Sequence, residues 1–456
     1  MTSSIDGRRE RLSTSDFLFS NALLVDPGTG TFGSRDLLVR DGRIVESAPS
    51  LAPYPQWKRE EGPLEIYDLT GYCLFPGLVD IHIHLRVPGQ EHKETLVTGT
   101  RAAAAGGFTS VLTMPNTSPC LDRASVIRDL NKRIASEAVV RVYPVGAVTR
   151  EQKGRSLAPL EALRREGAIA FSDDGRPVMN ACLARQAMQK ALEIGCPTIS
   201  HCEDDHLARG GAVQEGEVAE KLGVKGIPSA AEDVMTARDL ALAWDTGAHL
   251  HLAHVSTAKS LEMIRKAKDR GIRVTAEVTP HHLVLDEKVV LELGSNAKMN
   301  PPLRPEEDLL ALQEGLRDGT VDAVASDHAP HHPDEKASSL AEAPFGVIGL
   351  ETTLPVMLSL VHQERIGLER AIELLTVGPA RAMGLDAGTL QVGRPADLVI
   401  VDPDRTFRVD AGSFRSKARN CPFDGWSMRG RTLLTMVGGK VVHEEKDSLK
   451  DRFSKG

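Results

Sequence analysis

Two histidines, His82 and His84, are the side chains of this 456-residue chain best suited to metal chemistry. They lie in a predicted buried strand, Leu78–His84. Residues two apart on a strand point to one face, so the two imidazoles should converge while Ile81 and Ile83 pack the other way. Converging imidazoles at a strand end favour a divalent, zinc-like ion. For this motif alone, a purely structural histidine pair is the alternative.

Further ligand-type side chains end later predicted strands. A purely structural role would explain any one of these strand ends, but it does not explain five of them together. Four imidazoles and two carboxylates exceed what one tetrahedral ion uses, and they suit two ions that share a bridging ligand and a hydroxide. The later candidates are Asp173 or Asp174, His201, His254 and Asp327.

The elements that must position these residues are strands and helices in regular alternation. This alternation indicates an α/β fold with a parallel sheet, and eight strand–helix units close a (β/α)8 TIM-type barrel. The alternative is an open doubly wound sheet, but no Gly-x-Gly-x-x-Gly turn follows the first strand. The predicted strands are 78–84, 109–114, 139–146, 168–173, 197–202, 249–255, 273–279 and 322–327, and the predicted helices include 122–138, 181–194, 230–244 and 258–270.

Both ends of the chain show a different pattern, in which apolar and polar residues alternate between turn signals. Hairpins of this type need partners, so the two ends are expected to pair in one small β-sandwich beside the barrel. The expected organisation is a tail at 1–15, a composite sandwich of 16–72 plus 385–445, a barrel at 73–384 and a tail at 446–456.

Composition narrows the class of protein. The chain carries 55 Lys and Arg against 63 Asp and Glu, a net charge of −8, with no basic block, so nucleic acid is not an expected partner. Six scattered cysteines without a Cys-x-x-Cys motif fit reduced thiols. No secretory signal is evident, and no apolar run reaches the roughly 18–20 residues that span a bilayer. A cytoplasmic location is expected.

Five motifs carry a resemblance over nearly the whole chain. The chain resembles the dihydroorotases of the long bacterial type, within the amidohydrolase superfamily, which implies a barrel with a terminal β-sandwich. The motifs are Asp80-Ile-His-Ile-His-Leu-Arg-Val-Pro-Gly89, Met114-Pro-Asn-Thr117, Phe171-Ser-Asp-Asp-Gly175, Lys298-Met-Asn-Pro-Pro-Leu-Arg304, and Ala325-Ser-Asp-His-Ala-Pro-His331 followed by Lys336.

The resemblance implies a metal centre of two zinc ions per subunit, bridged by Asp174 and a hydroxide. Many relatives bridge with a carboxylated lysine, but residues 154–189 contain no lysine. Asp173 is the alternative bridge, because adjacent strand residues face opposite ways; the family spacing to His201 favours Asp174. The implied ligands are His82, His84 and Asp327 for one ion, and His201 and His254 for the other.

The resemblance also implies a reaction, the reversible cyclisation of N-carbamoyl-L-aspartate to L-dihydroorotate with loss of water. Asp327 would be the catalytic acid–base group. Arg86, two residues beyond His84, shares its inward face and suits a substrate carboxylate. The expected substrate contacts are His84, Arg86, Asn116, Asn300, His331, and the backbone of Phe345 and Gly346. The polar segment 332–344 is a candidate lid, with an ordinary surface loop as the alternative.

Two other functions remain open at this stage. One is a related cyclic amidase (dihydropyrimidinase, hydantoinase or allantoinase), which usually needs the missing lysine and would leave Arg86 without a substrate charge. The other is an inactive dihydroorotase-like partner of aspartate transcarbamoylase, although every expected ligand position is filled. Family analogy suggests a homodimer or larger assembly, and association with aspartate transcarbamoylase is a further expectation.

Overall fold

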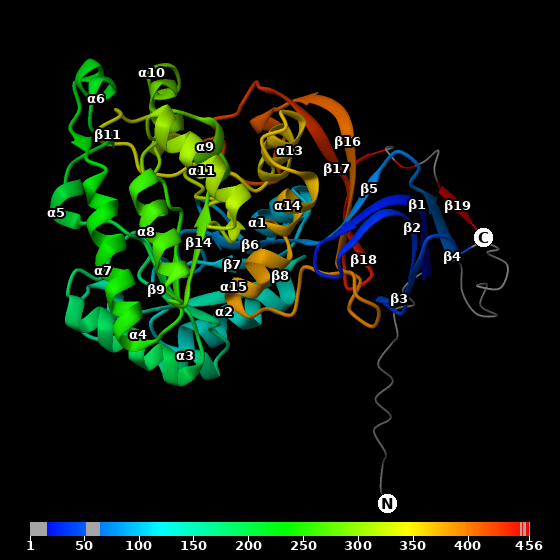
Figure 1. The fold of residues 1–456 in the computed structure, drawn as a ribbon, viewed down its shortest axis with the longest axis horizontal. Helices are drawn as coiled ribbons and strands as arrows, with labels where there is room; N and C mark the ends of the chain where they lie inside the picture. The colour runs from blue at the N-terminus through cyan, green and yellow to red at the C-terminus, as the bar shows by residue number, and fades with distance from the viewer. Residues whose placement is uncertain (1–15, 52–63, 447–448, 450–452, 456) are drawn as a thin grey trace, which may run out of the picture.

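The computed structural model describes residues 16–51, 64–446, 449 and 453–455. The predicted tail at 1–15 therefore lies outside the described residues, as do 52–63 of the predicted sandwich. Figure 1 shows two parts, a barrel wrapped in helices and a strand-rich part built from both ends of the chain. Among the described residues, no helix is both long enough and apolar enough to cross a membrane.

The barrel contains eight parallel strands in sequence order, which confirms the predicted fold class. The first strand meets the segment that follows the last strand through a bridge between Ile83 and His328, where the His84 amide donates to the His328 carbonyl over 2.9 Å. The strands are β6 (Leu78–Ile83), β7 (Phe108–Thr113), β8 (Arg141–Ala147), β9 (Ala170–Ser172), β10 (Thr198–Ser200), β13 (Leu250–Leu252), β14 (Val274–Val278) and β15 (Ala323–Val324).

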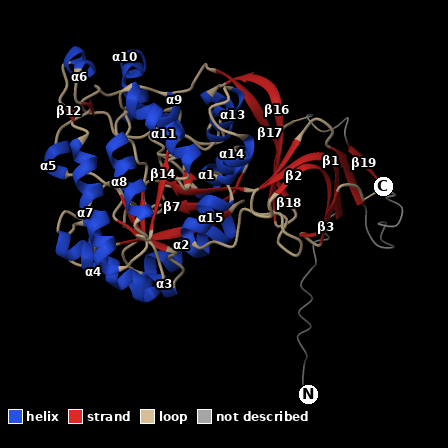
Figure 2. Cartoon of the chain, in the orientation of Figure 1, coloured by secondary structure: helices blue, strands red, loops and turns tan. Residues whose placement is uncertain are grey.

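Helices form the outer layer of the barrel (Figure 2). Helix α4 shows how the sequence sets their ends: the Asn180 side chain caps its first turn, and Gly195, with φ of 74°, ends it in the left-handed conformation. The principal helices are α1 (Leu96–Ala105), α2 (Ala124–Glu137), α3 (Leu160–Arg165), α4 (Ala181–Ile194), α7 (Ala230–Thr246), α8 (Ala258–Asp269), α11 (Glu306–Asp318), α13 (Thr353–His362), α14 (Leu368–Glu373) and α15 (Val377–Met383).

Short elements lie in the loops that join these units. The parallel pair β11 and β12 and most of the short helices lie between the later barrel strands. These elements are α5 (Asp205–Ala208), β11 (Val213–Gln214), α6 (Glu217–Leu222), β12 (Gly226–Ile227), α9 (Pro280–Val284), α10 (Val290–Leu293) and α12 (Pro333–Lys336), with 3-10 turns at Arg150–Gln152, Glu287–Val289, Gly294–Ala297 and Ala411–Ser413.

The two ends of the chain share one nine-stranded sheet, the sandwich-like part expected from the sequence. Its core strand β5 pairs in parallel with β1 and antiparallel with β16, so the chain ends are joined by main-chain hydrogen bonds. The strands are β1 (Asp16–Asp26), β2 (Thr31–Arg40), β3 (Arg43–Ala48), β4 (Leu64–Asp68), β5 (Cys73–Pro76), β16 (Leu398–Arg408), β17 (Ser427–Val437), β18 (Lys440–Glu444) and β19 (Phe453–Lys455).

Some boundaries differ from the sequence-based expectation. Strand β5 belongs to the terminal sheet although the barrel was expected to begin at residue 73, and β19 pairs with β4 inside the segment 446–456 expected to be a tail. The last barrel strand is shorter than the predicted 322–327. There the Asp80 carboxylate accepts from the Ser326 amide over 3.2 Å, and Asp327 takes a φ of 45°, which leaves strand geometry.

One packing expectation on β6 is wrong. Ile83 packs in the outer core against the helices, as expected, but Ile81 lies in a cluster with Leu112, Val145 and Ala323 from other barrel strands. The cause is a shift in register against β7 between Asp80 and Ile83. The shift lets His82 point inward although its neighbour Ile81 also faces the barrel interior.

Candidate active site

A single cavity of about 190 Å³ at the strand ends contains nearly all the site residues that the sequence singled out. Of the twelve, eleven line it, and His82 is fully buried beside it. The lining is His84, Arg86, Asn116, Asp174, Gly175, His201, His254, Asn300, Asp327, Ala329, His331, Phe345 and Gly346.

Asp174 lies at the centre of the four histidines. Its Oδ1 is 3.3 Å from His82 Nε2, 3.7 Å from His201 Nδ1 and 3.8 Å from His254 Nε2, and its Oδ2 is 3.6 Å from His84 Nε2. Burial opposes ionisation, but the imidazoles, His82 first, hold the pKa of Asp174 well below its usual value. A carboxylate in this position can offer one oxygen to each of two cations.

The neighbouring carboxyl group points elsewhere. Asp173 accepts hydrogen bonds from the amide of Thr149, over 3.0 Å, and from the Thr149 hydroxyl. Burial raises the pKa of Asp173 to about 6, despite those hydrogen bonds. The structure therefore brings Asp174, and not Asp173, into the histidine cluster.

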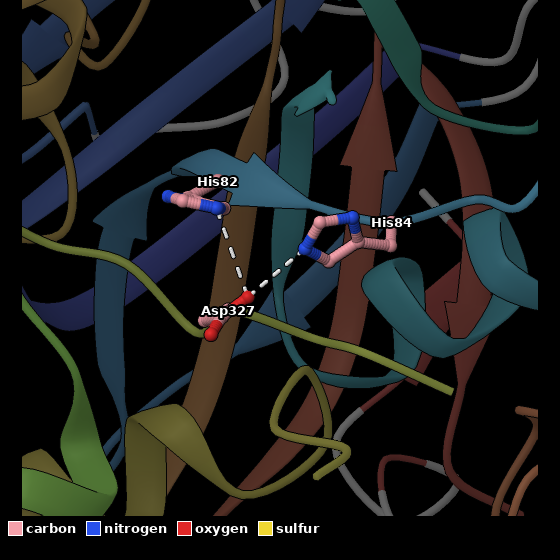
Figure 3. Close-up of side chains that lie close together, drawn as sticks. All are labelled: His82, His84 and Asp327. Atoms are coloured by element: carbon pink, nitrogen blue, oxygen red, sulfur yellow. Dashed lines mark hydrogen bonds and ion pairs between the residues drawn. The ribbon is translucent and has the colours of Figure 1, made fainter. Parts of the chain in front are cut away.

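Asp327 completes one end of the cluster, as Figure 3 shows. Its Oδ1 lies 3.1 Å from His84 Nε2 and 3.7 Å from His82 Nε2. Burial works against ionisation here too, but the hydrogen bond from His84 and the charge on His82 keep the pKa of Asp327 below its ordinary value. At neutral pH this group is a carboxylate, able to accept a proton.

The donor set fits metal ions. Two groups of three have all their ligand atoms within 4.8 Å of one another: His82, His84 and Asp327, and His82, Asp174 and His254. Among the described residues, the buried His82 Nε2 has no hydrogen-bond partner, and it faces both carboxylates. An unpartnered buried nitrogen is costly unless a ligand satisfies it. Imidazoles with carboxylates suit zinc and similar divalent ions.

Two histidines of the cluster, His82 and His84, are each held from behind by a second side chain. His82 Nδ1 lies 2.6 Å from Glu277, and Glu277 also contacts His251 Nε2 over 3.0 Å. His84 Nδ1 lies 2.9 Å from Asn116 Oδ1. Such contacts fix the ring orientation and leave the other nitrogen free for a metal.

Sequence reasoning missed Glu277 and His251. Both are fully or almost fully buried in strands β14 and β13. Their signal was available, because a carboxylate and an imidazole in the middle of predicted barrel strands need buried partners. Burial disfavours ionisation of Glu277, but the charge on His82 and the two histidine contacts lower its pKa to about 2.

Backbone strain is concentrated at this site. Of the eight non-glycine residues with positive φ in the described ranges, three line the cavity: Arg86 at 60°, His254 at 34° and Asp327 at 45°. Each such conformation costs about 1–3 kcal/mol and persists only where the surroundings impose it. Backbone strain at buried, potentially metal-binding and charged positions is typical of functional sites.

Arg86 is the cation of the cavity. Its Nε donates to the Pro330 carbonyl over 3.1 Å, and its Nη2 lies 3.3 Å from His331 Nε2. Arg86 is 8% exposed, and burial lowers the pKa of its guanidinium to about 10, so it stays charged at neutral pH. No carboxylate of the described chain lies within ion-pair distance of it.

The comparisons with known proteins agree with this geometry. Residues 71–260 match the family described as Dihydro-orotase-like, and residues 234–443 match the Amidohydrolase family. Among solved structures, an L-hydantoinase from Arthrobacter aurescens is 28% identical with a TM-score of 0.84, covering 94% of this chain and 96% of that one. A dihydropyrimidinase from Brevibacillus agri, 24% identical with a TM-score of 0.82 over 94% of this chain and 95% of that one, shows the shared fold.

Fold and side-chain cluster define the class, an enzyme of the metal-dependent amidohydrolase superfamily. A dihydroorotase of Desulforapulum autotrophicum is 47% identical over 428 residues, covering 94% of this chain and 99% of that relative. One of Pelotomaculum thermopropionicum is 47% identical over 430 residues with the same coverage. The chain belongs to the dihydroorotase family, which confirms the resemblance stated from its motifs.

Proposed function

We propose that this enzyme is a cyclic amide hydrolase that interconverts N-carbamoyl-L-aspartate and L-dihydroorotate plus water, the third step of de novo pyrimidine (UMP) biosynthesis. The observation that carries this choice is Arg86, a buried cation beside the histidine cluster with no carboxylate of the described residues within ion-pair distance. A buried charge is costly unless it is paired, so this cavity suits a substrate that brings a carboxylate. Both forms of the proposed substrate do.

The proposed metal centre holds two zinc ions. His82, His84 and Asp327 would hold one, His201 and His254 the other, and Asp174 would bridge them, which the contacts of Asp174 with all four histidines support. When bound, the ions supply a water of lowered pKa and polarise the amide carbonyl.

Asp327 is the proposed catalytic acid–base group. In hydrolysis, the water oxygen bonds to the ring amide carbon, the carbon–nitrogen bond breaks, and Asp327 carries the proton from the water to the departing nitrogen. Its carboxylate is ionised and lines the cavity, as a proton acceptor must. In cyclisation the same proton travels in the opposite direction.

The remaining cavity residues are proposed to hold the substrate. Arg86, with Asn116 and His331, would bind the carboxylate, because a guanidinium forms paired hydrogen bonds with it. Asn300 would bind the ring together with the backbone at Phe345 and Gly346. His84 shares the cavity and would contact the substrate as well as the metal.

The test compares an acidic ring with a neutral one. Native enzyme loaded with zinc should hydrolyse dihydroorotate and cyclise N-carbamoyl-L-aspartate, and dihydrouracil should be a very poor substrate. Arg86→Met should lower kcat/KM for dihydroorotate by about two to three orders of magnitude, since losing one partner of a buried charge pair costs several kcal/mol.

The zinc content of Arg86→Met should stay near native, and its rate with dihydrouracil should fall much less. Arg101→Met, on the exposed face of α1, is the matched control and should keep native kinetics. Equal native rates on the acidic and neutral rings would reject this function in favour of a hydantoinase-type cyclic amidase.

Assembly and location are proposed from family analogy and composition. A homodimer or larger assembly, association with an aspartate transcarbamoylase, and a cytoplasmic location remain proposals, the last supported by six free cysteines. Light scattering of the purified protein, alone and mixed with the transcarbamoylase, tests the first two.

A further inference from the structure

The cavity wall formed by Gly346 is made of backbone. Gly346 has a φ of 126°, and a Cβ there would lie 2.7 Å from the Ala329 Cβ and 3.2 Å from His331 Nε2. No side chain fits at this position without displacing the wall. The shape of this part of the cavity therefore depends on where the main chain is held.

The polar groups of Gly346 are engaged within the protein. Its amide donates to the Lys298 carbonyl over 2.9 Å, and its carbonyl accepts from Lys336 Nζ and Asn420 Nδ2, each over 3.0 Å. A carbonyl oxygen has two lone pairs, and both are used here. The position of the wall is thus set by the protein itself, and Gly346 would contact a substrate through the packing surface of its backbone.

Lys336 holds the wall from one side. It is 5% exposed, and its Nζ donates to the carbonyls of Pro344 (2.9 Å), Gly346 (3.0 Å) and Lys298 (3.3 Å). An ammonium group has three N–H donors, so all three are matched. Lys336 does not line the cavity, and two of its acceptors, Pro344 and Gly346, flank Phe345 in the sequence. The third, Lys298, places its Nζ 4.6 Å from the centroid of the Phe345 ring.

Asn420 holds the same wall from the other side. It lies between β16 and β17 and is 3% exposed. Its Nδ2 donates to the carbonyls of Ala329, over 3.1 Å, and Gly346, while its Oδ1 accepts from the His331 amide over 3.4 Å. One side chain from the terminal part of the chain therefore joins the segment after Asp327 to the Phe345–Gly346 wall.

We propose that Lys336 and Asn420 are positioning residues that set substrate affinity by fixing the Phe345–Gly346 backbone opposite the metal ligands. The inference rests on the proposed function for the identity of the substrate. Neither residue contacts the histidine cluster, so the chemistry itself should be spared. The wall contacts substrate in both the ground state and the transition state, and loss of such uniform binding raises KM and leaves kcat.

The test uses Lys336→Met and Asn420→Ala, singly and combined. Each single variant should raise KM for dihydroorotate about tenfold, with kcat within about twofold of native and zinc per chain unchanged. Because both donors bind one carbonyl, the double variant should show less than the product of the two effects. Lys288→Met, which removes an exposed lysine, is the matched control and should keep the native KM.

Native KM in both folded variants, or a fall in kcat with KM unchanged, would overturn the inference. Calorimetric titration with L-dihydroorotate, carried out with each substitution in a zinc-loaded Asp327→Asn background that turns over slowly, gives the same comparison as a tenfold rise in Kd. A native enzyme that binds dihydroorotate but does not turn it over would defeat the proposed function alone. A native enzyme that does not bind it would overturn both. If Lys336→Met fails to fold, Asn420→Ala decides the matter.

Discussion

The metal side of the cavity, which carries the proposed ligands His82, His84, Asp174, His201, His254 and Asp327, and the Phe345–Gly346 wall opposite it are made rigid in different ways. On the metal side, the groups proposed to bind metal belong to side chains at strand ends, and two of them are held by another side chain, His82 by Glu277 and His84 by Asn116. In the wall, the main-chain carbonyl of Gly346 is held by Lys336 and Asn420, two side chains that lie outside the cavity. The first arrangement fixes the positions of the proposed metal-binding atoms, and the second fixes the shape of the cavity.

The largest effect should come from the centre of the metal side. Asp174→Ala removes the group that contacts all four histidines, so the zinc content should fall from about two per chain and turnover should be lost. Asp173→Ala is the matched control, because Asp173 contacts Thr149 instead. Metal analysis with an assay of each variant checks this. Greater damage from Asp173→Ala would reverse the assignment of the bridge.

Asp327→Asn should separate metal binding from proton transfer on the same side. An amide ligates weakly but cannot carry a proton, so much of the zinc should remain while kcat falls by about two to four orders of magnitude. Zinc content and kcat are measured on one preparation. A variant that keeps near-native kcat would remove Asp327 from the acid–base role.

Glu277→Gln tests the support behind the metal side. The Glu277 carboxylate accepts from both His82 and His251, and a glutamine side chain offers only one carbonyl oxygen, so zinc affinity should fall about 10- to 100-fold. Competition with a coloured chelator measures this. Glu262→Gln, on exposed α8, is the control. Unchanged affinity would mean that His82 is held by its buried surroundings alone.

The smallest effect concerns the wall and pH. Burial, and then the charge of Lys298, lower the pKa of Lys336 to about 7, against about 10.4 in an unfolded chain. Between these values the folded state binds fewer protons than the unfolded one, so raising the pH stabilises the native protein. Melting curves at pH 7 and pH 9 should therefore show Tm of the native enzyme rising by a few degrees relative to Lys336→Met. A constant difference would mean that Lys336 stays charged across this range.

The metal side and the wall also differ in how far the sequence predicts them. The fold class and family follow from features that repeat or stand out in the sequence, namely eight strand–helix units and motifs such as His82-Ile-His84. The structure then gathers those side chains into one cavity. Asp174 was favoured over Asp173 only through family spacing, since the direction of a side chain at a strand end depends on local register.

No comparable feature of the sequence indicated the Phe345–Gly346 wall or the side chains that hold it. Asn420 lies far along the chain from Gly346 in an irregular segment, and an isolated asparagine there reads as an ordinary loop residue. Lys336 belonged to a recognised motif, but a lysine in a polar loop suggests exposure, whereas it is 5% exposed. The lid at 332–344 stays a prediction, and hydrogen exchange with and without substrate tests it.

The pairing of β5 with β16 sets the order in which the protein can be completed during translation. Strand β5 ends at Pro76 and β16 begins at Leu398, so the whole barrel must be synthesised between them. At roughly 5–20 residues per second, the ribosome needs tens of seconds for that stretch. Throughout this time β5 has an open edge, which attracts non-native strand pairing. A nascent chain stalled before Leu398 should therefore bind chaperones, and release from them should follow emergence of β16.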